Sequence, residues 1–153
     1  MPEGMSIHFE GLSEFQTSIA NLVKATEAAT KLAVVKAGNI VKKNAQTGLA
    51  LRSHPKGTWS PSPPGDAPAL VTGALRRSIT VKVSSEGFAG AKAEIGPTII
   101  YGRIQELGGS TGRNHSVRLP ARPYMRPALE YSMPEMSRVY LEAWEAAFLT
   151  KVI

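Results

Sequence analysis

The stretch "LSEFQTSIANLVKATEAATKLAVVKAGNIVKKNAQTG", residues 12–48, decides the fold, because it predicts one long amphipathic helix. Ser13 and Gln16 have the spacing of a capping box at its start, and Gly48 is a residue that commonly ends a helix. Apolar residues recur every three or four positions, as one helix face requires: they are Leu12, Phe15, Ile19, Leu22, Ala29, Ala33, Ala37, Ile40 and Val41.

The predicted length of this helix sets a constraint on the fold. About 35 residues at 1.5 Å each give a rod of roughly 50 Å. That exceeds the diameter of a compact domain of 153 residues, so the helix either breaks near Thr26–Thr30 or projects at one end. The second half of its apolar stripe consists of alanine and valine, which favours the close approach of another element.

The chain closes with a second amphipathic helix, "SMPEMSRVYLEAWEAAFLTKV", residues 132–152. Ser132 and Glu135 form another capping-box pattern, and Pro134 is tolerated in the first turn of a helix. Its apolar face consists of Met136, Val139, Tyr140, Ala143, Trp144, Ala147 and Phe148. We therefore expect helices at both ends of the fold.

The middle of the chain predicts a β-hairpin and short connecting elements. Apolar residues at 79, 81 and 83 alternate with polar ones, "SSEG" turns the chain, and residues 88–95 alternate in the same way. Residues 72–78 predict a capped helical turn, residues 98–109 a short helix ending at Gly108–Gly109, residues 110–116 a loop or hairpin tip, and "SVRL" a short strand. The fold class is thus α+β, with the two long helices packed on a small, mainly antiparallel β-sheet.

Residues 51–70 predict an extended, proline-rich loop or arm within a single domain, residues 1–153. The segment "RSHPKGTWSPSPPGDAPAL" contains five prolines and no hydrophobic period. Trp59 is its large apolar residue, and a bare loop does not need a tryptophan. We expect Trp59 to dock, and a neighbouring subunit is one place for it.

The composition excludes several classes of protein. An apolar content of 42% and a charged content of 20% are typical of a globular chain. The apolar runs are too short for a membrane-spanning helix, and the first eleven residues lack the apolar core of a secretory signal. Because the chain has no cysteine, disulfides, thiolate nucleophiles and cysteine zinc sites are absent. We expect a protein made and assembled in a cytosol, without a membrane partner.

Charge is unevenly distributed. The net charge of +6 divides into +1 for residues 1–50, +7 for residues 51–126 and −2 for residues 127–153. The basic middle is either a solvated surface or a face for nucleic acid or an acidic protein partner. No ladder of aromatic residues accompanies the basic ones, which argues against stacking on single-stranded nucleic acid.

No catalytic motif is present. The chain has one aspartate, Asp66, and its three histidines, His8, His54 and His115, lack the spacing of metal ligands. "GGSTGR" lacks the Gly-Lys-Ser/Thr of a phosphate-binding loop. His115 beside Arg113 is a candidate for anion binding, but an exposed loop histidine is the favoured interpretation. We expect no enzyme, metal or cofactor.

The stretch "RLPARPYMRPAL", residues 118–129, is stiff and basic. Prolines fix the backbone torsion φ and leave little entropy to lose on assembly. Arginine suits bidentate pairing with carboxylates of an adjacent subunit. Alternatively, Arg122 and Arg126 tie down their own domain, for example through Glu106 or Glu130. The prolines and arginines are Pro120, Pro123, Pro127, Arg118, Arg122 and Arg126.

The order of these elements resembles the tail-component, or neck, family of tailed bacteriophages, and overlaps the phage virion-morphogenesis family. The likeness covers nearly the whole chain. Its most specific part is "PARPYMRPAL", residues 120–129, followed by "TGALRRSI", residues 72–79. The family usually has an acidic residue followed by Gly-Thr after its tyrosine element. This chain has Glu106-Leu107-Gly108-Gly109, so the local turn is expected to differ.

The resemblance implies a small subunit that forms a ring, commonly a hexamer, at the head–tail interface of the virion. Such a tail terminator, tail-completion or neck protein ends the tail tube and meets the head-completion or connector proteins, while genomic DNA passes through the ring without sequence-specific binding. Assembly would take place in the cytoplasm of the bacterial host. The candidate interface residues are Arg118, Arg122, Pro123, Tyr124, Arg126, Arg76, Arg77 and Trp59.

The competing hypothesis is a basic module that binds double-stranded DNA. Its affinity would fall steeply with salt, because bound phosphates release counterions. No helix-turn-helix or zinc-knuckle pattern supports this hypothesis.

Overall fold

A computed structural model describes residues 10–51, 60–86 and 90–149 of the chain. It confirms the predicted α+β class. The elements in chain order are α1 (Leu12–Ala50), α2 (Ala74–Ser78), β1 (Ile79–Ser85), β2 (Ala91–Pro97), α3 (Gly102–Leu107), β3 (Gly109–Thr111), the 3-10 turn η1 (Arg113–His115), β4 (Val117–Leu119) and α4 (Met125–Leu149).

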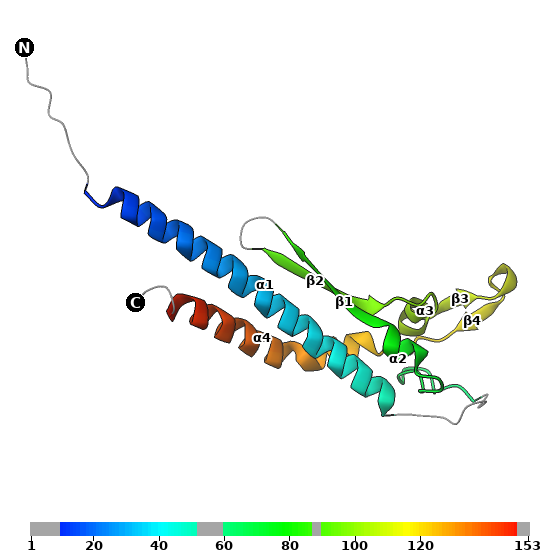
Figure 1. Cartoon of the computed structure of the whole chain (residues 1–153). Helices are drawn as coiled ribbons and strands as arrows, with labels where there is room; N and C mark the ends of the chain where they lie inside the picture. The colour runs from blue at the N-terminus through cyan, green and yellow to red at the C-terminus, as the bar shows by residue number, and fades with distance from the viewer. Residues whose placement is uncertain (1–9, 52–59, 87–89, 150–153) are drawn as a thin grey trace, which may run out of the picture.

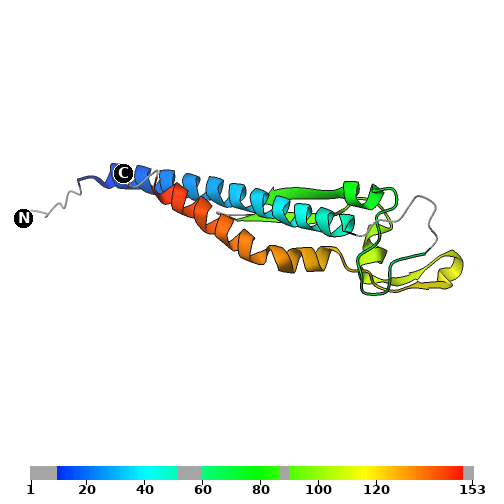
Figure 2. The ribbon, with the colours of Figure 1, turned by 90° about the horizontal axis from the view of Figure 1, so that it is seen from below.

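Helix α1 is the axis of the molecule. Helix α4 runs antiparallel along it, and the antiparallel β1–β2 hairpin lies along another side (Figures 1 and 2). The short helices α2 and α3 and the β3–β4 hairpin gather around the C-terminal end of α1. The protein is therefore an elongated rod with most of its connecting elements at one end.

Helix α1 has no break near Thr26–Thr30, so the second of the two expected arrangements is the one observed. Its N-terminal end projects beyond the end of α4 (Figure 1). The predicted capping box is wrong, because the helix starts after Gly11, whose φ is 81°, and has no side-chain cap. The helix also continues past Gly48 to Ala50.

Helix α4 begins at Met125, seven residues before the predicted N-cap. Ser132 is therefore inside the helix and fully buried. Its hydroxyl donates to the Ala128 carbonyl at 2.6 Å and accepts from the Asn44 side-chain amide at 2.8 Å. Pro134 lies in the helix interior and not in the first turn. The predicted capping box at Ser132 is wrong because the true start is fixed by a distant residue, described below.

The β1–β2 hairpin lies directly on α1. Val81 pairs with Ile95 across the hairpin. Gly38 of α1 faces these residues so closely that an added Cβ would lie 2.7 Å from Cγ1 of Val81. Gly38 and Asn44 are about 120° apart around the helix at roughly 100° per residue. Helix α1 thus carries the hairpin on one face and α4 on another.

Ala29, Ala33 and Val41 of α1 are buried, and the main cluster of the buried core lies near the C-terminal end of α1. It consists of Ala45, Leu49, Ile79, Tyr124 and Ala128. Residues from α1, β1 and the start of α4 meet there, which fixes the relative positions of these three elements. None of the described helices combines the length and the apolar character needed to cross a membrane.

Candidate interaction surfaces

Glu106 caps the start of α4 from a different element. Its carboxylate, on α3, accepts the backbone N–H groups of Tyr124 at 2.7 Å, Met125 at 2.9 Å and Arg126 at 3.0 Å. The first N–H groups of a helix have no partner within it, and the positive end of the helix dipole favours an anion. We call this arrangement the Glu106 cap, and it explains why α4 starts where it does.

Tyr124 joins the Glu106 cap to the core. Its hydroxyl donates to the Gly102 carbonyl at 3.2 Å. Burial, with smaller contributions from the charges of Glu106 and Tyr101, raises the pKa of Tyr124 well above its usual value. The phenol therefore stays protonated and remains a donor. Tyr124 was a candidate interface residue, but the structure buries it within its own chain.

Arg122 also points into its own chain, with 7% of its surface exposed. Its Nε donates to the Ser62 carbonyl at 2.8 Å, and its backbone N–H donates to Gln105 at 2.7 Å. Gly65 in turn donates to the carbonyl of Ala121 at 2.9 Å. The stretch 118–129 thus holds α3 and the end of the proline-rich loop, residues 60–70, together. Of the two roles considered for Arg122, the structure supports the internal one.

The other arginines of this stretch are exposed. Arg126 pairs with Glu130 of the same helix at 3.0 Å, and exposed pairs of this kind contribute little to stability. Arg118 lies on β4 with its side chain exposed. Pro123 is half-buried. The interface role of Arg118 and Arg126 stays a prediction.

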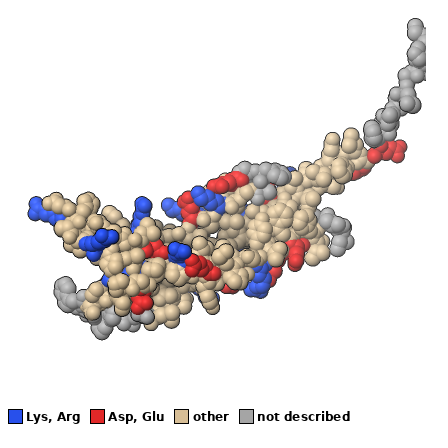
Figure 3. Space-filling view, turned by 180° about the vertical axis from the view of Figure 1, so that it is seen from behind, with Lys and Arg blue, Asp and Glu red and all other residues tan. Residues whose placement is uncertain are grey.

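Exposed basic side chains gather at the end of the molecule that carries the short elements. Figure 3 shows basic side chains at the end of the molecule that carries the β3–β4 hairpin, and in that hairpin these are arginines, Arg113 and Arg118. Arg76 and Arg77 of α2 are also exposed, and Arg77 donates to the Thr72 carbonyl at 3.0 Å. The described exposed arginines outside residues 118–129 are Arg76, Arg77, Arg103, Arg113 and, on α4, Arg138. Trp59, the last candidate, lies outside the described residues.

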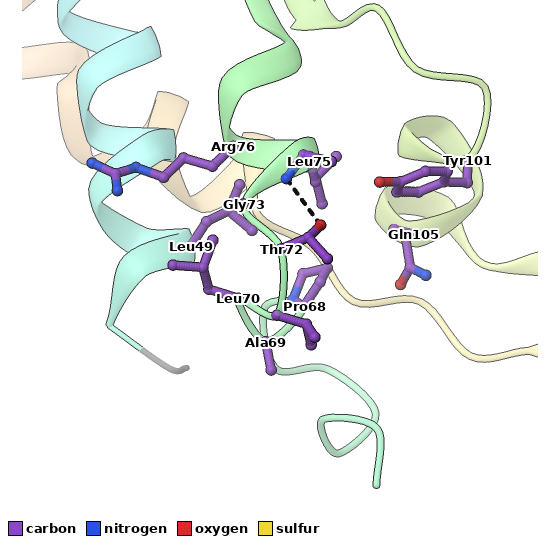
Figure 4. Close-up of a pocket in the computed structure, with 12 residues that line it drawn as sticks. Leu49, Pro68, Ala69, Leu70, Thr72, Gly73, Leu75, Arg76, Tyr101 and Gln105 are labelled. Atoms are coloured by element: carbon purple, nitrogen blue, oxygen red, sulfur yellow. Dashed lines mark hydrogen bonds between the residues drawn. The ribbon is translucent and has the colours of Figure 1, made fainter. Parts of the chain in front are cut away.

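A hollow of about 200 Å³ lies beside α2, between α1 and α3 (Figure 4). Thr72 lines it, and its hydroxyl accepts the Ala74 N–H at 3.3 Å. The short helix predicted over residues 72–78 is present as α2, but its N-cap is Gly73 and it has no side-chain cap. Tyr101 lies on one side of the hollow, and the guanidinium of Arg76 points away from it on the opposite side. Small-molecule sites usually have at least about 300 Å³. The hollow is therefore better explained as a packing gap between elements.

The described residues contain no group of three or more His, Cys, Asp and Glu side chains that could hold a metal ion. His115 and Arg113 lie on an exposed turn.

The surface that sequence reasoning missed is apolar. Leu12, Phe15 and Ile19 on the projecting end of α1, which we call the tip stripe, are 52%, 64% and 46% exposed. On α4, ring centroids of Tyr140, Trp144 and Phe148 follow one another at 5.8 Å. We call these three rings the aromatic ladder. The periodicity identified both sets as apolar helix faces, but it did not show that they stay exposed.

Comparisons with protein-family models, with curated proteins and with solved structures gave no match to this chain.

Proposed function

We propose that this chain is a structural, non-enzymatic subunit of the head–tail interface of a tailed phage. It would act as a ring-forming tail terminator, tail-completion or neck protein that joins the tail tube to the head-completion or connector proteins. The proposal rests on the resemblance carried by residues 120–129 and 72–79 and on the surface described above. Its place would be in the virion, after assembly in the host cytoplasm.

The observation that carries the proposal is the uncovered tip stripe. A helix of a finished globular protein buries its apolar stripe against a core, and large exposed apolar patches mark interaction sites. Here α1 extends well past the element that covers it, with Leu12, Phe15 and Ile19 about half exposed or more. Such a surface fits a subunit whose folding is completed by assembly.

The opposite end supplies a rigid, basic surface. The Glu106 cap and the buried Arg122 fix the backbone of the stiff stretch, so little entropy is lost when a partner binds it. The exposed Arg118 and Arg126, together with Arg76 and Arg77, are the arginines available to carboxylates of a neighbour. We infer that this end faces other virion proteins or lines the channel through which DNA passes.

Mass photometry and electron microscopy of the purified chain, with and without tail-tube subunits, test the proposal. We expect rings, commonly hexamers, and attachment of the chain to one end of each tail tube. A chain that stays monomeric and leaves tail tubes bare at both ends would contradict the proposal.

Binding of double-stranded DNA is a second candidate function, favoured by the exposed arginines Arg103, Arg113 and Arg118 at one end. A gel-shift assay at two salt concentrations separates it from the first. A DNA-binding module should retard duplex DNA strongly at low salt and lose that affinity at high salt. A ring that DNA only passes through should bind it weakly at both.

A further inference from the structure

The tip stripe continues the face of α1 that packs against α4. Asn44 marks that face, because its side chain donates to Ser132 of α4. Ile19 and Phe15 lie 25 and 29 positions earlier, within roughly 20° of Asn44 at 100° per residue. The same stripe is therefore covered in the later turns of α1 and uncovered in its first turns.

The Asn44–Ser132 contact also gives the length of the uncovered part. In antiparallel helices of equal rise, positions pair in opposite directions, so the end of α4 at Leu149 lies opposite about residue 27. Burial on α1 begins at Thr26, in agreement. About four turns of α1, roughly 20 Å, thus extend beyond α4.

These turns have an unusual composition for an exposed helix. No charged residue occurs between Glu14 and Lys24, whereas the free face of a surface helix normally carries charges. The hydroxyls of Thr17 and Ser18 donate to the carbonyls of residues four positions earlier, each at 2.9 Å. The polar side of these turns therefore carries uncharged groups only, the amides of Gln16 and Asn21 and two hydroxyls that are bonded within the helix.

A matching apolar surface exists on the same chain but on a different element. Tyr140 and Phe148 of the aromatic ladder are 42% and 39% exposed, on the last half of α4. Leu141 and Leu149 are also exposed there. Two different patches on one chain pair heterologously between copies, and a heterologous contact that closes gives a ring.

The areas are sufficient for such a contact. The exposed parts of these side chains amount to on the order of 700 Å², since a large side chain has roughly 200 Å² to bury. Apolar atoms make up a little over half of an interface, and stable interfaces start at about 1,200 Å² in total. The patches can thus supply the apolar part of one stable interface. They are Leu12, Phe15, Ile19, Tyr140, Leu141, Phe148 and Leu149.

We propose that the tip stripe of one copy packs on the aromatic ladder of a second copy. The occupant of the uncovered stripe is then α4 of the neighbour, which continues the cover that the chain's own α4 gives to the rest of α1. This inference rests on the proposed assembly into a ring and names the surfaces that form it.

Two double variants and a mixing experiment test this pairing. The tip variant carries Phe15→Glu and Ile19→Glu, and the ladder variant carries Tyr140→Glu and Phe148→Glu. The matched control carries Thr17→Glu and Asn21→Glu, which add the same charge to the opposite face of the same turns. Circular dichroism should show wild-type helix content in all of them, because the replaced side chains are exposed.

Mass photometry, with and without tail-tube subunits, gives the readout. We expect oligomers for the wild type and the control, and monomers for the tip variant and the ladder variant alone. Mixed one to one, the two variants should form dimers, because each supplies the intact surface that the other lacks. If the ladder variant fails to fold, Phe148→Glu alone replaces it.

Three results would overturn the pairing: a wild type that remains monomeric in both settings, a tip variant that assembles as the wild type does, or a ladder variant that does so. If the ladder variant assembles on its own while the tip variant stays monomeric, the contact is instead between two tips. The outcome also separates the two proposals. A tip variant that still forms rings and still closes tail tubes leaves the proposed function intact and removes only this inference.

Discussion

The two ends of the molecule are built differently. At the base, formed by the second half of α1, α2, β1, β2, α3 and the start of α4, polar groups have specific partners and the core is closed. At the tip, formed by the start of α1 and the last half of α4, no such cluster of described buried residues lies between the two helices. Large apolar side chains are exposed at both ends, for example Ile100 and Tyr131 at the base and Phe15 at the tip. The difference between the ends is therefore the closed core, which the base has, and we propose that the tip is completed by a second copy.

The largest effect is expected for the Glu106 cap. Glu106→Ala leaves three backbone N–H groups at the start of α4 without an acceptor, and should lower the free energy of unfolding by about 3 kcal/mol. Urea unfolding at a concentration where the chain is monomeric measures this. Glu130→Ala, which removes only the exposed pair with Arg126, should cost less than about 0.5 kcal/mol. Equal losses in the two variants would refute the assigned role of Glu106.

A slightly smaller effect is expected where the hairpin lies on α1. Gly38→Leu forces side-chain atoms against Val81 and should destabilise the chain by about 2–3 kcal/mol. Gly48→Ala on the same helix meets no atom within 4 Å, and should stabilise it by about 0.5–1 kcal/mol. Thermal unfolding of both variants, followed by circular dichroism, is the measurement. A stabilising Gly38→Leu would show that the hairpin does not lie where the structure places it.

Replacing Arg122 by alanine distinguishes a role in the stability of the chain from a role in assembly. Arg122→Ala removes a buried donor from the Ser62 carbonyl, and should cost about 2 kcal/mol of unfolding free energy. Arg118→Ala, at an exposed position, should leave stability within about 0.5 kcal/mol. If Arg122→Ala unfolds like the wild type and only loses ring formation, its role lies between subunits.

The smallest effect on the isolated chain is expected at the tip. Phe15→Ser replaces a side chain that the monomer leaves 64% exposed, so the free energy of unfolding of the monomer should change by less than about 0.5 kcal/mol. A loss of 2 kcal/mol or more in urea unfolding of the monomer would mean that Phe15 packs within its own chain.

Local sequence patterns predicted the elements whose stabilising contacts are local. The period of α1 and the alternation of the hairpin were visible because each follows from one repeating face. The start of α4 was not visible, since it is set by Glu106, which lies 19 residues before Met125. Pro134 was assigned to the first turn of this helix because the true start, at Met125, was not visible.

The candidate surface was predicted in part. The interface role of Arg118 and Arg126 stays a prediction, and Arg126 makes the pair with Glu130 that the internal alternative named. Sequence reasoning could not see that Arg122 donates to the Ser62 carbonyl, 60 positions away. The apolar residues of the tip were identified as part of a helix stripe, but the stripe alone did not tell which of its residues stay uncovered. One signal was present in the sequence: nine uncharged residues, Phe15 to Val23, in a helix too long for its domain.

Hydrogen exchange of the backbone amides of α1 tests the contrast between tip and base most directly. In the dilute monomer, amides of residues 15–23 should exchange fast and those of residues 41–49 slowly, because only the second group lies under a closed core. On assembly, residues 15–23 should gain protection while residues 41–49 change little. Slow exchange of residues 15–23 in the monomer, or no gain of protection in assembled rings, would contradict the account.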